Sequence, residues 1–211
     1  GFIPLEKEYK MSPRLRGILF FYALVLLLFC KESLGNVIEA NAAFERGDYS
    51  IAKKLYLREK NSVAAQINLA KIFMSTDIEK AEKWVDKALG QEKKNAEAHY
   101  LKGLILGKQA EESTFSGISL ARKAKGSFET ALSLDEENTS YIDALIKFHT
   151  RAPSIAGGDK GTAMHLLDKL EKIDRKTAYK ARFEFFKETD NTLEAENVLE
   201  KAQKMFPDSP F

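Results

Sequence analysis

Small residues recur along most of the chain at intervals close to the length of a two-helix repeat. Five alanines can be aligned as equivalent positions, and their successive separations are 29, 43, 39 and 32 residues. An internal period in this range indicates stacked repeats, in which each unit shares its hydrophobic core with its neighbours. The aligned alanines are Ala52, Ala81, Ala124, Ala163 and Ala195.

The stretch from Ala40 to Tyr56 shows the pattern of one unit. It has small residues where two helices would cross, a Gly47-Asp48 turn and an aromatic residue late in the second helix. This pattern resembles a tetratricopeptide (TPR) unit, whose period is about 34 residues. The resemblance extends over residues 36–207 in five degenerate units. It implies an all-α TPR-like solenoid of about five antiparallel helix pairs, wound as a right-handed superhelix.

Two of the intervals are longer than the TPR period. The interval of 43 residues places about nine additional residues in the third unit, between Gly103 and Ala124. The interval of 39 residues places a loop, residues 151–162, between the two helices of the fourth unit. The elongated third unit and the Ala-Pro-x-Ile-x-Gly-Gly sequence of this loop resemble a group of exported bacterial TPR proteins of undefined activity.

Residues 1–35 form a separate segment before the repeats, in which we expect an upstream remnant, residues 1–10, followed by a targeting segment that starts at Met11. An uncharged apolar run, residues 17–30, follows two arginines and precedes small residues, which is the pattern of a secretory signal peptide. We expect cleavage before Asn36, a mature TPR-like domain at 36–211, and export to the bacterial periplasm.

The alternative for this segment is a retained membrane anchor facing the periplasm, although a membrane span usually needs about 20 apolar residues. A third alternative is lipid attachment at Cys30, but Phe29 stands where a lipoprotein has a small residue. In either case, contact with the membrane would occur only through this segment.

Charge and cysteine content limit the partners of residues 36–211. This region holds 28 basic and 28 acidic residues and no cysteine. A neutral domain lacks the basic surface that nucleic-acid binding requires, and a chain without cysteine has no thiolate metal site. The histidines His99, His149 and His165 lack the spacing of a zinc pair on one helix. We therefore expect no nucleic-acid partner, no cofactor and no metal.

The loop at residues 151–162 contains the one stretch that resembles a phosphate-binding motif. Its glycine spacing differs from Gly-x4-Gly-Lys-Ser/Thr, and no strand precedes it. We expect instead that Pro153 ends one helix, that Gly157 and Gly158 adopt left-handed angles, and that Asp159 caps the next helix.

A catalytic site would have to use His149, together with Asp159 or Asp143, beside this loop. It would also require polar groups from several repeats to meet in one pocket. No other catalytic motif is found in the mature region. We therefore predict that the chain is not an enzyme, and keep an enzyme with a site near residues 151–162 as the least favoured alternative.

First helices line the concave surface of TPR solenoids, and relatives that grip peptide backbones use two asparagines there, which correspond to Asn41 and Asn68. The basic residues of a carboxylate clamp are absent, because Val37, Glu97 and Leu101 stand at those positions. The full candidate peptide-binding groove comprises Asn41, Asn68, Lys71, His99, Lys102 and Asp143.

The leading prediction is a non-enzymatic protein-protein interaction scaffold in the cell envelope, with a protein or peptide partner on the concave face. A membrane-anchored envelope assembly factor is the alternative. The sequence leaves the oligomeric state open.

Overall fold

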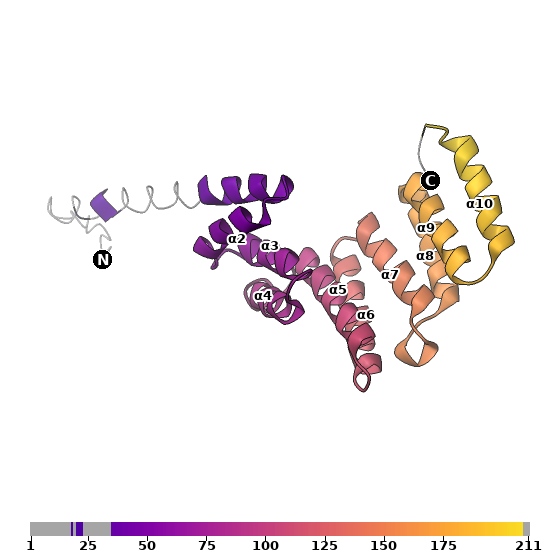
Figure 1. The fold of residues 1–211 in the computed structure, drawn as a ribbon, viewed down its shortest axis with the longest axis horizontal. Coiled ribbons are helices and arrows are strands. Elements are labelled where there is room, and N and C mark those ends of the chain that lie inside the picture. Colours follow the sequence, from indigo (N-terminus) through magenta and orange to yellow (C-terminus); the bar gives the residue numbers. More distant parts are fainter. Residues whose placement is uncertain (1–17, 19, 23–34, 209–211) are drawn as a thin grey trace, which may run out of the picture. The chain divides into compact units, whose positions relative to one another are not determined.

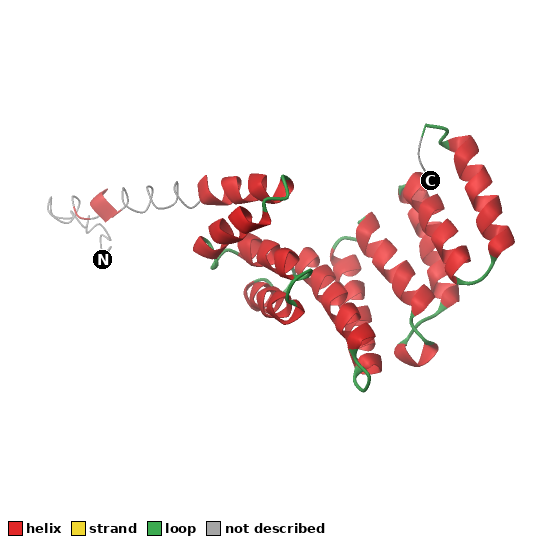
Figure 2. Ribbon diagram, viewed as in Figure 1, coloured by secondary structure: helices red, strands yellow, loops and turns green. Residues whose placement is uncertain are grey.

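The computed structural model describes residues 18, 20–22 and 35–208. All regular elements in these ranges are helices (Figure 2). The chain divides into two compact units, Gly1–Lys60 and Asn61–Phe211. None of the described helices is long and apolar enough to cross a membrane. The expected signal peptide or anchor, including Cys30, lies almost wholly outside the described residues.

Residues 35–58, within the described part of the first unit, form an antiparallel helix pair. A helix covers residues 35–45, and α2 covers Tyr49–Arg58. The turn between them is the one expected from the sequence, since Gly47 has a φ angle of +81°, which favours glycine. Ala40 and Ala52 are fully buried, as small residues are where two helices approach closely.

Four further helix pairs make up the second unit (Figure 1). The first helix of each pair packs on the second helix that follows it. The first helices are α3 (Val63–Phe73), α5 (Ala96–Glu112), α7 (Thr139–Arg151) and α9 (Arg175–Glu188). The second helices are α4 (Ile78–Gln91), α6 (Gly117–Leu134), α8 (Lys160–Ile173) and α10 (Thr192–Met205). A short 3-10 helix, η1 (Ser154–Ala156), lies between α7 and α8. The all-α repeat fold expected from the sequence is confirmed.

The repeat alanines lie in the cores between these helices. Ala81, Ala124 and Ala163 are fully buried, and Ala195 is 5% exposed. The additional residues of the third unit lengthen both of its helices, to 17 residues in α5 and 18 residues in α6. The elongation expected from the repeat spacing therefore takes the form of an extended helix pair with a short turn at its tip.

Short polar side chains fix where most helices of the second unit begin. An aspartate or asparagine precedes the helix and accepts a hydrogen bond from a backbone N–H of the first turn, which would otherwise have no acceptor. This arrangement occurs at Asp77, Asn95, Asn138, Asp159 and Asp174.

Candidate interaction surface

The loop between α7 and α8 is built largely as the sequence suggests. Helix α7 ends at Arg151, and Asp159 caps α8 by accepting hydrogen bonds from the Gly161 N–H (2.9 Å) and the Thr162 hydroxyl (2.8 Å). Only Gly157 has a left-handed angle, with φ of +98°. The same expectation was wrong for Gly158, which serves to let the chain pass close to the Ala152 carbonyl, where a Cβ atom would clash.

His149 lies beneath this loop. Its side chain is 4% exposed, and its Nδ1 atom is buried without a hydrogen-bond partner among the described residues. Burial lowers the pKa of this imidazole, Lys125 lowers it further, and Asp159 and Glu129 oppose the shift. The Asp159 carboxylate caps α8, and the described residues show no hydrogen bond between it and the His149 ring, so the pair that the least favoured catalytic alternative would need is not formed.

The other proposed catalytic partner, Asp143, accepts a hydrogen bond from Lys147 at 2.6 Å. His165 is exposed, and the Nε2 atom of His99 lies 2.9 Å from the Lys93 carbonyl oxygen. In the described part of the chain, no group of three or more His, Cys, Asp or Glu side chains is placed to hold a metal ion.

The two asparagines of the predicted groove fall in different units. In the first unit, Asn41 is exposed and its Oδ1 atom accepts a hydrogen bond from the Tyr56 hydroxyl at 2.7 Å. Asn41 therefore contributes to holding its helix against α2. In the second unit, Asn68 is half-buried on α3.

Lys71 of α3 forms an ion pair with Glu97 of α5, with 2.5 Å between Nζ and Oε1. Both residues belong to first helices, so this pair joins two neighbouring first helices. Glu97 stands where a carboxylate clamp would need a basic residue, and the structure shows that it serves as the partner of Lys71.

Lys102 lies on a different side of α5. It donates hydrogen bonds to Glu82 (2.8 Å) and Asp86 (2.7 Å) of α4. Burial lowers its pKa, but the two carboxylates outweigh burial, so that the pKa is raised overall.

Tyr100, by contrast, contacts Tyr141 of α7, with ring centroids 5.0 Å apart. Residues two positions apart in a helix point in directions that differ by about 200° around the helix axis. Lys102 and Tyr100 therefore face nearly opposite directions, and His99 lies on the Lys102 side. The structure does not bring His99 and Lys102 together with Asp143, which lies on α7.

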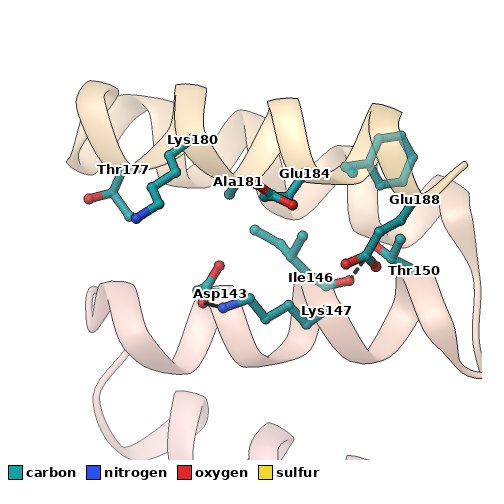
Figure 3. A pocket seen from close by; sticks show the side chains of 10 residues that line it. Asp143, Ile146, Lys147, Thr150, Thr177, Lys180, Ala181, Glu184 and Glu188 are labelled. Atoms are coloured by element: carbon teal, nitrogen blue, oxygen red, sulfur yellow. Dashed lines mark hydrogen bonds and ion pairs between the residues drawn. The ribbon is translucent and has the colours of Figure 1, made fainter. Parts of the chain in front are cut away.

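Asp143 does line a groove, which runs between the first helices α7 and α9 (Figure 3). The groove has a volume of about 260 Å³. Its floor is apolar and its sides carry charged groups from both helices. The lining residues are Asp143, Ile146, Lys147, Thr150, Thr177, Lys180, Ala181, Glu184, Phe185 and Glu188.

The charges of this groove are only partly neutralised. Asp143 pairs with Lys147, and Glu188 accepts hydrogen bonds from Arg151. Lys180 and Glu184 project from α9 and form no ion pair with any residue that the structure describes. Neither of these α9 residues was among those predicted from the sequence to line the groove. Their spacing of four on a first helix, which puts two side chains on one face, was the signal available.

No protein-family model matches this chain, and no curated protein matches it in sequence. Solved structures do share its fold. The TPR protein TTC0263 of Thermus thermophilus is 12% identical, with a TM-score of 0.68, over 83% of this chain and 92% of that one. MamA is 19% identical, with a TM-score of 0.55, over 78% of this chain and 92% of MamA. YrrB, a TPR protein with an unusual peptide-binding site, is 16% identical, with a TM-score of 0.56, over 82% of this chain and 86% of YrrB. This chain therefore has the fold of the TPR proteins.

Proposed function

We propose that this chain is a non-enzymatic interaction scaffold of the cell envelope that binds a protein or peptide segment in the groove between α7 and α9. The observation that carries the proposal is the groove itself. Ile146 and Phe185 form an apolar floor, and Lys180 and Glu184 offer one donor and one acceptor that pair with no described residue.

An extended peptide suits such a surface because its backbone carries both acceptors and donors. Lys180 would donate to a peptide carbonyl, Glu184 would accept from a peptide N–H, and an apolar side chain would bury against Ile146. Helical repeat proteins use the surfaces of their stacked units in this way. YrrB, which has the same fold, is described by its peptide-binding site, although at 16% identity its own residues do not transfer to this chain.

The envelope location is part of the proposal and is supported by the apolar run at 17–30 and by the likeness of the 151–162 loop to exported TPR proteins. If the chain is exported and cleaved, intact-mass measurement of the periplasmic fraction should give the mass of a protein that begins at Asn36. A membrane-anchored assembly factor predicts the full-length chain in the membrane fraction, released by detergent and not by salt.

The binding role is tested by exchanging the two charges of α9. The double variant Lys180→Glu with Glu184→Lys keeps the net charge and removes no ion pair of the described structure. A matched control exchanges Glu196 and Lys201, two exposed residues of α10 outside the groove. Each full-length protein is immobilised, and the envelope proteins that it retains are identified by mass spectrometry.

We expect at least one partner to be retained by the wild type and by the α10 control and to be lost with the α9 exchange. Partners retained equally by all three proteins would contradict the assignment of the groove. Retention of nothing specific, under several growth conditions, would contradict the scaffold function.

A further inference from the structure

A second pocket lies where the two departures from the repeat period meet. The extended α5–α6 pair, the end of α7 and the loop around η1 surround a space of about 400 Å³. None of its lining residues belongs to the α7–α9 groove. The two additions to the repeat, which are separate in the sequence, thus build one feature of the surface.

Contacts around the pocket hold its walls in place. The guanidinium group of Arg122 on α6 donates two hydrogen bonds to the Ile155 carbonyl of η1, at 3.1 and 2.7 Å. The start of α6 approaches the end of α5 so closely that a Cβ atom on Gly117 would lie 2.9 Å from the Ala110 carbonyl oxygen. These contacts fix the walls of the pocket, in keeping with the largely pre-formed character of most binding pockets.

Large apolar side chains are exposed around this pocket. Phe115, at the tip between α5 and α6, is 100% exposed, Ile155 of η1 is 61% exposed and Ile118 is 45% exposed. Phe115 and Ile118 also line the pocket. Single exposed apolar residues are ordinary, whereas several gathered beside a cavity are a common feature of surfaces that bind a partner.

The charge at the pocket favours a basic partner. Glu111 lines the pocket at the C-terminal end of α5, Glu112 follows it, and the last turn of α5 has no basic residue. The end of a helix carries partial negative charge from its free carbonyl groups, so carboxylates there leave an electronegative site. Arg151, the basic residue of the lining, donates hydrogen bonds to Glu188, and the charge of Glu111 acts on it only at longer range. Glu111 is therefore partly compensated by Arg151, and it forms no ion pair within the described ranges.

We propose that this pocket binds a protein partner through a large apolar side chain that has a lysine or arginine close to it in the partner's sequence. The apolar side chain packs against Phe115 and Ile118, and the basic group pairs with Glu111. This site lies apart from the α7–α9 groove, so the proposal goes beyond the function proposed above and does not depend on it.

The probe for this proposal is a displayed library of random 12-residue peptides, selected on the full chain. The expected peptides combine an aromatic or large aliphatic residue with a nearby Lys or Arg. Gly107→Trp fills the pocket, and a Cβ atom at Gly107 meets nothing within 4 Å, so the helix accepts it. We expect this variant to weaken the binding of these peptides by about tenfold or more.

Two matched controls separate the pocket from general effects. Gly126→Trp adds the same side chain on α6 outside the pocket, where a Cβ atom also meets nothing within 4 Å, and should leave binding unchanged. Glu111→Lys should weaken the selected peptides, whereas Glu136→Lys, at an exposed position outside the pocket, should not.

Three results would overturn the proposal. The first is that none of the selected peptides binds Gly107→Trp more weakly than the wild type. Peptides that lose affinity only for the α9 charge exchange would count as this result, because they would bind in the α7–α9 groove. The second is enrichment of acidic instead of basic residues beside the apolar one. The third is sedimentation of the full chain as a dimer that Phe115→Ala dissociates, because a second copy would then occupy the pocket.

Discussion

Gly103 of α5 and the ring of Phe128 on α6 meet at a helix crossing where there is no room for one more carbon atom. A Cβ atom on Gly103 would lie 2.5 Å from the Cδ1 and Cε1 atoms of Phe128. Both residues are buried. Because Phe128 is enclosed on its other sides by the α5–α6–α7 core, its ring cannot move away without disturbing that core.

Gly103→Ala is therefore expected to lower the free energy of unfolding, because overpacking usually costs about 1 to 3 kcal/mol and the higher helix propensity of alanine offsets only about 1 kcal/mol of that cost. Gly107→Ala, one helical turn later, is the matched control. A Cβ atom there meets nothing within 4 Å, and alanine favours a helix over glycine by about 1 kcal/mol. Urea unfolding should give opposite signs for the two variants, and equal effects would contradict the close crossing.

A second prediction concerns the cap of α8. Asp159→Ala removes the acceptor for the Gly161 N–H and the Thr162 hydroxyl, and should lower the free energy of unfolding by about 1 kcal/mol. Asp159→Asn keeps a side-chain oxygen and should cost less. Thermal unfolding followed by circular dichroism tests this order, and an Asn variant as unstable as the Ala variant would contradict a capping role.

A third prediction concerns pH and His149. Burial holds the pKa of this imidazole below its usual value of 6.5, so the unfolded chain takes up a proton at a higher pH than the folded chain. Above pH 6.5 the His149 imidazole is neutral in both the folded and the unfolded chain, and the free energy of unfolding is not reduced. As the pH falls from 6.5 toward the lowered pKa, the unfolded chain takes up the proton first, so the free energy of unfolding decreases. The pKa values of Asp159 and Asp174 are also lowered, but these carboxylates lose their contribution only as the pH falls from 3.8.

The measurement is urea unfolding at about pH 7.5 and about pH 5.5, which bracket the reference pKa of histidine. The wild type should lose more stability between these values than His149→Leu does. His99 and His165 remain in both proteins, so their contributions cancel. An identical loss in both proteins would show that His149 does not set the dependence.

Features that depend on neighbouring residues could be predicted from the sequence. Small residues such as Ala52 and Ala163 indicate helix crossings because two helices can approach closely only where the side chains are small. Asp159 could be predicted as the cap of α8 because a capping side chain bonds to a backbone N–H within the next three residues. The length of the third unit followed from the repeat spacing. In each case the determining residues lie within one helix pair.

The interaction surface depends on packing between pairs, which the sequence does not specify locally. Lys102 and Tyr100 are separated by one residue, yet the first faces α4 and the second faces α7. The groove joins residues of α7 to residues of α9 that lie at least 27 positions later in the chain, the separation between Thr150 and Thr177. Which helix faces are brought together is set by how consecutive pairs stack, so Asp143 was found in isolation and Lys180 and Glu184 were missed.

The last prediction separates binding from stability at Asn41. Replacement of an exposed polar residue of a groove usually alters stability by only about half a kcal/mol. The structure changes that expectation, because Asn41 accepts a hydrogen bond from the Tyr56 hydroxyl, and Tyr56 is 1% exposed. Asn41→Ala should therefore lower the free energy of unfolding by about 1 kcal/mol, through loss of this bond.

Tyr56→Phe removes the same hydrogen bond from the other side, so the double variant should cost less than the sum of the two single variants. Urea unfolding of the four proteins gives this coupling energy directly. Strictly additive effects would mean that the bond does not contribute, and Asn41 would then be available to a bound peptide at no cost to the first helix pair.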